Sequence, residues 1–325
     1  MFYKLLKKLQ NFRKNKLFKN DKPKGPEGPE GPEEPEGFEQ HKCNVFSDKY
    51  VLGEKISEGT FGKVYKCFSK KTGNKYAVKI IPTKKLIQNE ITILQQVSHN
   101  NIIRMIEVFT DEKKTYIITE YCEFSDLFDY VMNLKNLKTL ENSEGYEQEI
   151  CSIVRQILLG VQYLHSKNIV HRDLKLSNIL FFDKTYNVKI IDFGLSVICK
   201  EPGELLEEEV GSIGFMSPEI IMGSYDKSCD MWSIGCITFI LLYGFNPFNP
   251  YNSGNKQIVY SNILKGFNSC NSTERRNVGA FFPNTSTTSI IKTSELSKDF
   301  IMSLLTSKDI RLNGSEALNH PWLKN

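Results

Sequence analysis

Two short polar motifs in the middle of the chain could carry out chemistry on a phosphate. Residues 171–178 read HRDLKLSN and residues 190–194 read IIDFG. A hydroxyl nucleophile needs a proton acceptor, which a carboxylate such as Asp173 supplies. The charge of a triphosphate needs Mg²⁺, whose preference for oxygen ligands suits Asn178 and Asp192. The two motifs therefore predict one compact site. The alternative is that these are loop residues that only cap helices, but then both motifs would have arisen in this order and spacing by chance.

A glycine-containing stretch and a strand lysine precede these motifs. Residues 56–64 read ISEGTFGKV, and their glycines predict a hairpin lid whose bare backbone can approach phosphate oxygens. Such hairpins are common, so this signal is weak by itself. Lys79 ends the strand-like run YAVK, where a buried charge needs an anionic partner. Glu90 is the candidate partner, and the alternative is an ordinary surface Lys and Glu.

The elements that must position these residues change in type along the chain. Strand-like runs cluster early, at residues 64–68, 76–81, 102–109 and 115–120. Helix-like runs dominate later, at residues 150–166 and 230–243. This segregation predicts an α+β fold, with a small β-rich lobe followed by a larger helical lobe.

Composition excludes several classes of protein. The chain has 325 residues, of which 40% are hydrophobic and 25% charged, so it is neither mostly disordered, nor collagenous, nor a disulfide scaffold. Its longest apolar run, residues 236–243, is far shorter than the roughly 18 residues that a bilayer span needs. The 8 cysteines form no C-x-x-C pair, which argues against a zinc cluster and favours reduced thiols in an intracellular, cytoplasmic setting. A net charge of +4 is too small to suggest nucleic acid as a partner.

The front of the chain is polarised. Residues 1–24 carry nine Lys and Arg against one Asp, and residues 1–19 place apolar side chains at helical spacing among these bases. This basic amphipathic segment predicts docking to an anionic membrane or an acidic partner, with peripheral membrane location as a consequence; the alternative is a solvated tail. Residues 25–43 contain Gly-Pro-Glu triplets and predict an extended linker. We expect the folded domain to occupy residues 44–325.

Together, the motifs resemble those of the eukaryotic protein kinase family, and the resemblance covers residues 48–325 in order. It implies the two-lobed protein kinase fold, with an N-lobe at about 48–120 and a C-lobe at about 123–325. It implies ATP and Mg²⁺ as cofactors and protein substrates with Ser or Thr acceptors. The residues that match the catalytic positions of the family are Lys79, Glu90, Asp173 and Lys175, and those that match its metal ligands are Asn178 and Asp192.

By the same resemblance, residues 119–122 (TEYC) match the hinge that holds adenine. Main-chain groups of Glu120 and Cys122 would bond the base, Thr119 would be a small gatekeeper, and Asp126 would meet the ribose. The resemblance places these residues around the nucleotide: Ile56, Ser57, Gly59, Gly62, Val64, Ala77, Lys79, Thr119, Glu120, Cys122, Asp126 and Leu180.

The activation segment lacks its usual phosphorylation site. Residues 211–219 (GSIGFMSPE) match the stretch that seats substrate, and within it Glu219 is expected to pair with Arg311. Between Phe193 and Gly211 the only hydroxyl belongs to Ser196, whereas residues 207–209 are three consecutive glutamates. We expect one of them to pair with Arg172 in place of a phosphate, which predicts activity without activation-loop phosphorylation. The alternative is a solvated acidic turn.

Within the family, the chain looks most like the calcium/calmodulin-dependent and calcium-dependent kinases. Lys175 and Ser212 match serine/threonine kinases, whereas Ser177 and Ile240 stand where relatives directed to basic substrates carry acids, so that only Asp126 remains to attract arginine. No autoinhibitory helix, calmodulin-binding segment or EF-hand loop follows Trp322, so any calcium control is expected to come from a separate calcium-sensor protein; the alternative is that the chain is truncated.

Two departures support an alternative function. Ser57 replaces the first glycine of the lid, and only 11 residues lead from Lys79 to Glu90, which predicts a shortened helix around Glu90. The alternative is a catalytically weak pseudokinase that acts as a scaffold.

Overall fold

The computed structural model describes residues 45–59, 62–82, 88–137, 143–267 and 293–324. Three segments therefore lie outside the described residues: the basic segment 1–24, the linker 25–43 and, except for Thr293, the Ser/Thr/Asn-rich stretch 268–293, whose composition predicts an insertion between helices.

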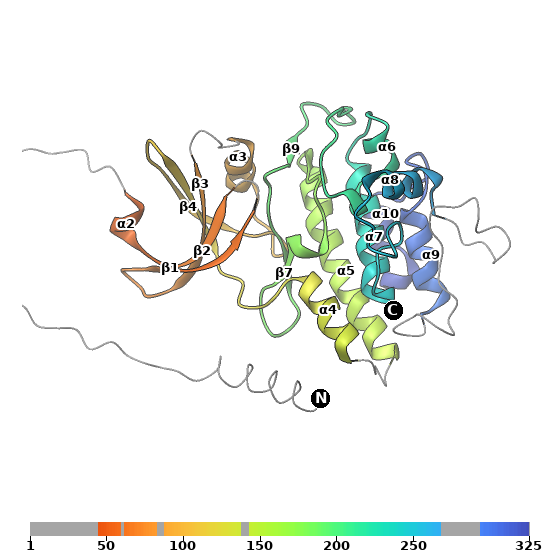
Figure 1. The fold of residues 1–325 in the computed structure, drawn as a ribbon, viewed down its shortest axis with the longest axis horizontal. Coiled ribbons are helices and arrows are strands. Elements are labelled where there is room, and N and C mark those ends of the chain that lie inside the picture. Colours follow the sequence, from red (N-terminus) through yellow and green to blue (C-terminus); the bar gives the residue numbers. More distant parts are fainter. Residues whose placement is uncertain (1–44, 60–61, 83–87, 138–142, 268–292, 325) are drawn as a thin grey trace, which may run out of the picture. The chain divides into compact units, whose positions relative to one another are not determined.

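An antiparallel sheet of five strands forms the N-lobe, with the strand order β1-β2-β3-β5-β4 (Figure 1). The strands are β1 (Tyr50–Glu58), β2 (Lys63–Ser69), β3 (Lys75–Pro82), β4 (Met105–Thr110) and β5 (Lys114–Glu120). The glycine-containing stretch is the β1–β2 hairpin, as predicted, and the N–H of Gly59 donates to the carbonyl of Gly62 at 2.9 Å. Helix α3 (Gln88–Gln96) follows β3 in the chain and carries Glu90 as its third residue.

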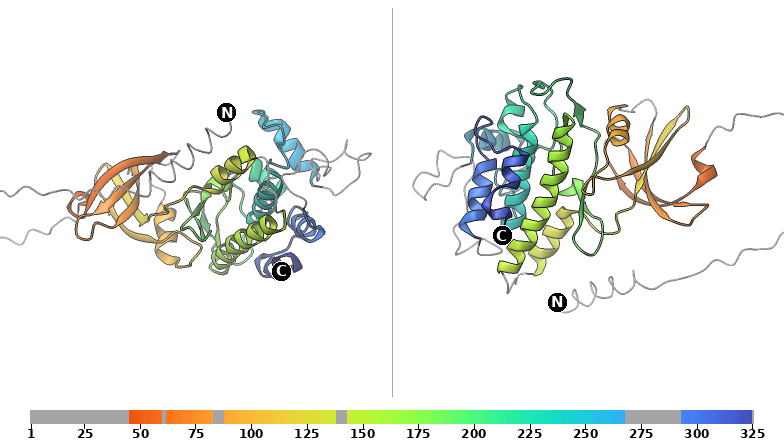
Figure 2. Two further views of the ribbon diagram at one scale, coloured as in Figure 1. Left: turned by 90° about the horizontal axis from the view of Figure 1, so that it is seen from below. Right: turned by 180° about the vertical axis from the view of Figure 1, so that it is seen from behind.

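The C-lobe is mainly helical and is built around helix α7, whose residues from Cys229 to Tyr243 are all buried. The helices of this lobe are α4 (Leu127–Leu137), α5 (Ser143–Ser166), α6 (Pro218–Ile221), α7 (Ser228–Tyr243), α8 (Lys256–Lys265), α9 (Glu295–Leu304) and α10 (Gly314–Leu318). Helix α7 packs between α5 and α9 (Figure 2). The sheet and this helical lobe confirm the predicted α+β fold.

Two small strand pairs carry the polar motifs. Strand β6 (Ile169–Val170) pairs with β9 (Val197–Ile198), and β7 (Ile179–Phe181) pairs with β8 (Val188–Ile190). Residues 171–178 connect β6 to β7, and Asp192 comes two residues after β8. The first motif therefore follows β6 and the second follows β8.

One predicted strand is wrong at its start. The run 102–109 reads as one strand in sequence, but β4 begins only at Met105. Ile102 instead forms a parallel bridge with Ile190 of β8, and the N–H of Ile103 donates to the carbonyl of Ile190 at 3.0 Å. Both side chains are buried, so their apolar character reflects packing against the C-lobe rather than membership of the sheet.

None of the described helices combines the length and the apolar character that a bilayer crossing requires.

Candidate functional site

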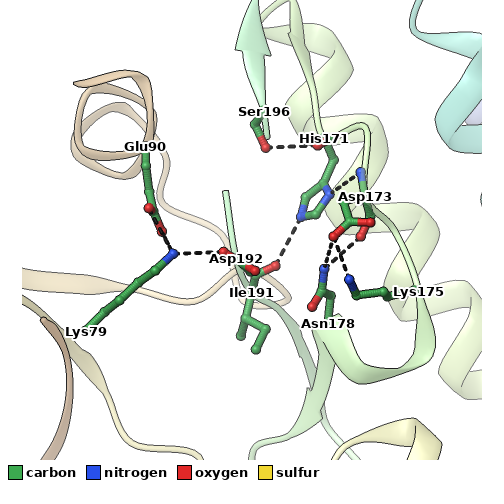
Figure 3. A network of polar contacts seen from close by, with 9 residues as sticks. All are labelled: Lys79, Glu90, His171, Asp173, Lys175, Asn178, Ile191, Asp192 and Ser196. Atoms are coloured by element: carbon green, nitrogen blue, oxygen red, sulfur yellow. Dashed lines mark hydrogen bonds and ion pairs between the residues drawn. The ribbon is translucent and has the colours of Figure 1, made fainter. Parts of the chain in front are cut away.

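Lys79 is held between two carboxylates from different parts of the chain. Its Nζ lies 2.7 and 2.9 Å from the two carboxylate oxygens of Glu90 and 2.9 Å from Oδ1 of Asp192. Figure 3 shows Lys79 and Glu90 on one side of Asp192 and the residues of the HRDLKLSN motif on the other. The predicted pairing of Lys79 with Glu90 is thus confirmed, and it joins β3 to α3.

Charge pairing outweighs burial for Lys79 and Asp192, whereas burial raises the pKa of Glu90 above its ordinary value. Burial alone would lower the pKa of Lys79, but the negative charges of Glu90 and Asp192 hold it above its ordinary value. Burial alone would raise the pKa of Asp192, but the nearby charge of Lys79 holds it below its ordinary value. Lys79 and Asp192 are therefore both charged near neutral pH.

Asp173 lies at the centre of a second polar group. Its Oδ2 accepts a hydrogen bond from Nζ of Lys175 at 2.8 Å and one from Nδ2 of Asn178 at 3.1 Å. Its Oδ1 accepts one from the hydroxyl of Ser212 at 2.8 Å, and this hydroxyl in turn accepts one from Lys175 at 2.9 Å. The carboxylate is therefore fixed in orientation on both oxygens, and Ser212 ties it to the activation segment.

A buried aspartate beneath the HRDLKLSN motif was not assigned a role from the sequence. Asp230 of α7 accepts hydrogen bonds from the N–H groups of His171 and Arg172, both at 2.9 Å, and lies 2.8 Å from the ring of His165. Burial alone would raise the pKa of Asp230, but these contacts hold it below its ordinary value. A charged residue in an otherwise apolar helix was the signal that could have identified it.

The arrangement of Asn178 and Asp192 fits a magnesium ion. Nδ2 of Asn178 donates to Asp173, at 2.8 Å to its carbonyl, so the amide oxygen of Asn178 faces away from Asp173. The N–H of Ile191 donates to the carbonyl of Asn178 at 2.9 Å, which holds Asp192 next to Asn178. Within the described part of the chain no three His, Cys, Asp or Glu side chains form a metal cage. Two oxygen donors that leave the remaining positions to phosphate oxygens are a common arrangement for this ion.

The residues expected around the nucleotide lie on the strands and the hinge. Those of the sheet are Ile56 and Ser57 on β1, Val64 on β2, Ala77 on β3, and Thr119 and Glu120 on β5, with Gly59 and Gly62 at the β1–β2 turn. Cys122 is half-buried just after β5, and Asp126 forms a bridge with Leu180 of β7. A Cβ on Gly62 would lie 2.6 Å from the carbonyl oxygen of Ile80, so only glycine fits there.

The activation segment is anchored through Arg172. Its Nη1 donates to Oε2 of Glu208 at 2.9 Å, and its Nε donates to the carbonyl of Leu195 at 2.6 Å. The hydroxyl of Tyr225 donates to the carbonyl of Glu208 at 2.8 Å. The predicted contact between the glutamate triplet and Arg172 is confirmed, and Glu208 is the residue that makes it.

The predicted pair at the end of this segment is confirmed as well. Both terminal guanidinium nitrogens of Arg311 contact the carboxylate of Glu219, with a distance of 3.1 Å between Nη2 and Oε2. Both residues are buried, so the pair joins α6 to the chain after α9 inside the protein.

Comparison with known proteins shows which sequences this chain resembles. Residues 50–323 match the family described as protein kinase domain. The chain is 40% identical over 215 residues to calcium-dependent protein kinase 5 of Plasmodium falciparum (isolate 3D7), covering 64% of this chain and 36% of the relative. It is 34% identical over 286 residues to calcium-dependent protein kinase 3 of Plasmodium berghei (strain Anka), covering 85% and 47%. Human death-associated protein kinase 2 is 36% identical over 304 residues, covering 88% and 74%. The chain spans about half the length or less of the first two relatives.

Proposed function

Because this chain belongs to the protein kinase domain family, we propose that it is a serine/threonine protein kinase that transfers the γ-phosphate of ATP to hydroxyl groups of proteins. The observation that carries this proposal is the joint assembly of two clusters, Lys79 with Glu90 and Asp192, and Asp173 with Lys175. They come from both lobes and supply the cation, the metal ligand and the proton acceptor that phosphoryl transfer needs.

In this proposal Lys79 binds the phosphates of ATP and Glu90 orients Lys79. Asn178 and Asp192 would hold Mg²⁺, which neutralises charge on the phosphates when it is bound. Main-chain groups of Glu120 and Cys122 would hold the adenine.

Asp173 would act as the base in the transfer. It would accept the proton of the acceptor hydroxyl while the hydroxyl oxygen bonds to the γ-phosphorus; the bond to the β-phosphate oxygen breaks, and ADP leaves with its electron pair. Lys175 lies 2.8 Å from Asp173 and would offset negative charge that builds up at the transferred group. The Lys175–Ser212 contact favours Ser and Thr over Tyr as acceptors, in line with the serine/threonine kinases that the chain resembles.

Transfer of labelled phosphate from Mg-ATP to a generic Ser/Thr substrate tests the proposal. We expect transfer by the intact chain, and a loss of at least about 100-fold in the Asp173→Asn variant, which keeps the size of the side chain but not its basicity. The alternative, a catalytically weak scaffold, is motivated by Ser57, which lies within β1 opposite Val64. Absence of transfer by the intact chain would favour it, and transfer that survives the substitution would indicate a contaminating kinase.

We propose further that the enzyme is active without phosphorylation of its activation segment. The support is the ion pair between Arg172 and Glu208, which gives this arginine a negatively charged partner without a phosphate. The main-chain hydrogen bonds between Leu206 and Tyr225, at 2.7 and 3.0 Å, hold the same segment without any modified residue.

Charge reversal tests this second proposal. Because the side chain of Glu208 is 72% exposed, the pair is partly screened, and we expect Glu208→Lys to lower kcat by about 10-fold rather than to abolish it. Glu207→Lys is the matched control, since it makes the same change one residue away and Glu207 has no partner among the described residues. Equal turnover in the two variants would refute a role for the ion pair.

Two proposals concern partners. The names of two relatives include calcium dependence, which supports regulation by a calcium-sensor protein. Turnover with calcium and calmodulin, compared with turnover after chelation, tests this regulation. The basic residues of segment 1–19 support docking to an anionic membrane or an acidic partner and hence a cytoplasmic, peripheral location. Co-sedimentation with phosphatidylserine vesicles, before and after removal of these residues, tests this docking.

A further inference from the structure

The three consecutive glutamates of the activation segment have three different environments. Glu208 faces Arg172, and Glu207 has no partner among the residues that the structure describes. Glu209 instead contacts helix α8, on a different part of the C-lobe. Adjacent residues of an extended segment point to opposite sides, which explains why Glu208 and Glu209 reach different elements.

The contact of Glu209 with α8 involves two side chains. Its Oε1 accepts a hydrogen bond from the hydroxyl of Tyr260 at 2.6 Å and one from Nζ of Lys256 at 2.8 Å. The ammonium of Lys256 also lies 4.7 Å from the centre of the Tyr260 ring, so these two residues of α8 support each other. We name this group the α8 clamp: Glu209, Lys256 and Tyr260.

Tyr260 extends the clamp into the protein. Its ring is buried in an apolar cluster with Met216 and Ile220, and its hydroxyl lies 3.5 Å from the sulfur of Met216. Met216 belongs to the stretch 211–219 that is expected to seat the substrate. The clamp therefore fixes α8 to the activation segment at two points, Glu209 before this stretch and Met216 within it.

The first residues of the same stretch, Gly211 and Ser212, are held by contacts that do not involve the clamp. Ser212 bonds to Asp173 and Lys175, and a Cβ on Gly211 would lie 2.6 Å from the carbonyl oxygen of Arg172. Release of Glu209 would therefore leave the geometry around Asp173 in place. It would loosen the surface between α8 and the activation segment.

We propose that Glu209 and Tyr260 are positioning residues for the protein substrate, an inference that rests on the proposed kinase function. The clamp orders the surface that binds the peptide next to its acceptor residue. Glu208, in contrast, pairs with Arg172 of the HRDLKLSN motif. The clamp has no part in the transfer step. Its loss is expected to raise KM for the peptide and to leave kcat and KM for ATP unchanged.

Tyr260→Phe is the sharpest variant, because it removes only the hydroxyl and keeps the buried ring. One hydrogen bond to a partly exposed carboxylate is lost, and we expect KM for a peptide substrate to rise by about three- to tenfold. Glu209→Gln, which removes the charge at the other end of the same contact, should act in the same direction. Glu207→Lys is the control and should leave both constants within about twofold of the intact chain.

A second measurement tests, independently of catalysis, whether the clamp orders the activation segment. Hydrogen exchange should become about fivefold faster or more at the amides of residues 209 and 210 in the Tyr260→Phe variant, and stay unchanged in the control. Unchanged KM together with unchanged exchange would overturn the proposal, and so would a fall in kcat with KM unchanged. If the intact chain transfers no phosphate, the proposed function fails, and the exchange measurement alone still decides whether the clamp orders this segment.

Discussion

Loss of the positive charge at Lys189 should destabilise this protein more than loss of any surface lysine. Lys189 lies in the middle of β8, and its Nζ is 2.7 Å from Oε1 of Glu120 at the end of β5. It also donates to the carbonyl of Asn100 at 3.0 Å. The same oxygen of Glu120 accepts the N–H of Arg104 at 2.9 Å. One ion pair thus joins the predicted hinge, the loop after α3 and the strand that leads to Asp192.

Burial sets the size of the expected effect. The side chains of Lys189 and Glu120 are only 10% and 12% exposed, so Lys189→Met leaves a buried carboxylate without its cation. Removal of one partner of a buried pair costs about 3–5 kcal/mol, which for a protein of this size corresponds to a decrease in Tm of about 5–8 °C. The double variant, Lys189→Met with Glu120→Gln, removes both charges, so that no unpaired charge stays buried. It should therefore be about 2 kcal/mol more stable than Lys189→Met alone.

Urea unfolding of the two single variants and the double variant measures this coupling. Lys75→Met is the control, since the pair of Lys75 with Glu123 has side chains 51% and 56% exposed and should contribute less than about 1 kcal/mol. The reasoning from burial is refuted if Lys189→Met is no more destabilising than Lys75→Met. It is also refuted if the losses of unfolding free energy in the two single variants simply add up in the double variant.

Three further predictions concern other parts of the fold. Burial raises the pKa of Cys122 to about 12, so its alkylation by iodoacetamide at pH 8 should be roughly 50-fold slower than that of a free thiol and should accelerate as pH rises; mass spectrometry of the labelled peptide measures this. Gly235→Ala would place a Cβ 2.8 Å from Cδ2 of Leu305, and the thermal unfolding curve should show a loss of about 1–3 kcal/mol. Glu147→Ala removes the carboxylate that accepts Nε1–H of Trp322 at 2.9 Å, and should both lower stability by about 2 kcal/mol and shift the tryptophan fluorescence.

The sequence predicted the parts of the site that are encoded locally. Asp173, Lys175 and Asn178 lie within six residues, so their meeting required only that one loop fold back on itself. The pairing of Lys79 with Glu90 was predictable for another reason. A lysine in a strand that is otherwise apolar needs a nearby carboxylate, and few were available.

Contacts between distant segments were harder to predict. Glu120 and Lys189 are separated by 69 residues, and Glu209 and Tyr260 by 51, and neither pair belongs to a periodic pattern. The start of β4 was misjudged for the same reason, because Ile102 is apolar in order to pack on β8 and not to extend the sheet. Periodicity reports that a side chain is buried, and it does not report which element buries it.

The backbone of the site shows why distant residues matter to it. Arg172 and Asp192 have φ values of 66° and 62°, in the left-handed region that costs a residue other than glycine about 1–2 kcal/mol. Such conformations persist only where surrounding contacts compensate. For Arg172 one compensating contact is the bond from its N–H to Asp230, 58 residues later in a buried helix, and for Asp192 one is its ion pair with Lys79. The orientation of the polar motifs is therefore set by α7 and β3, so a change in either element should disturb the site even when every residue of both motifs is intact.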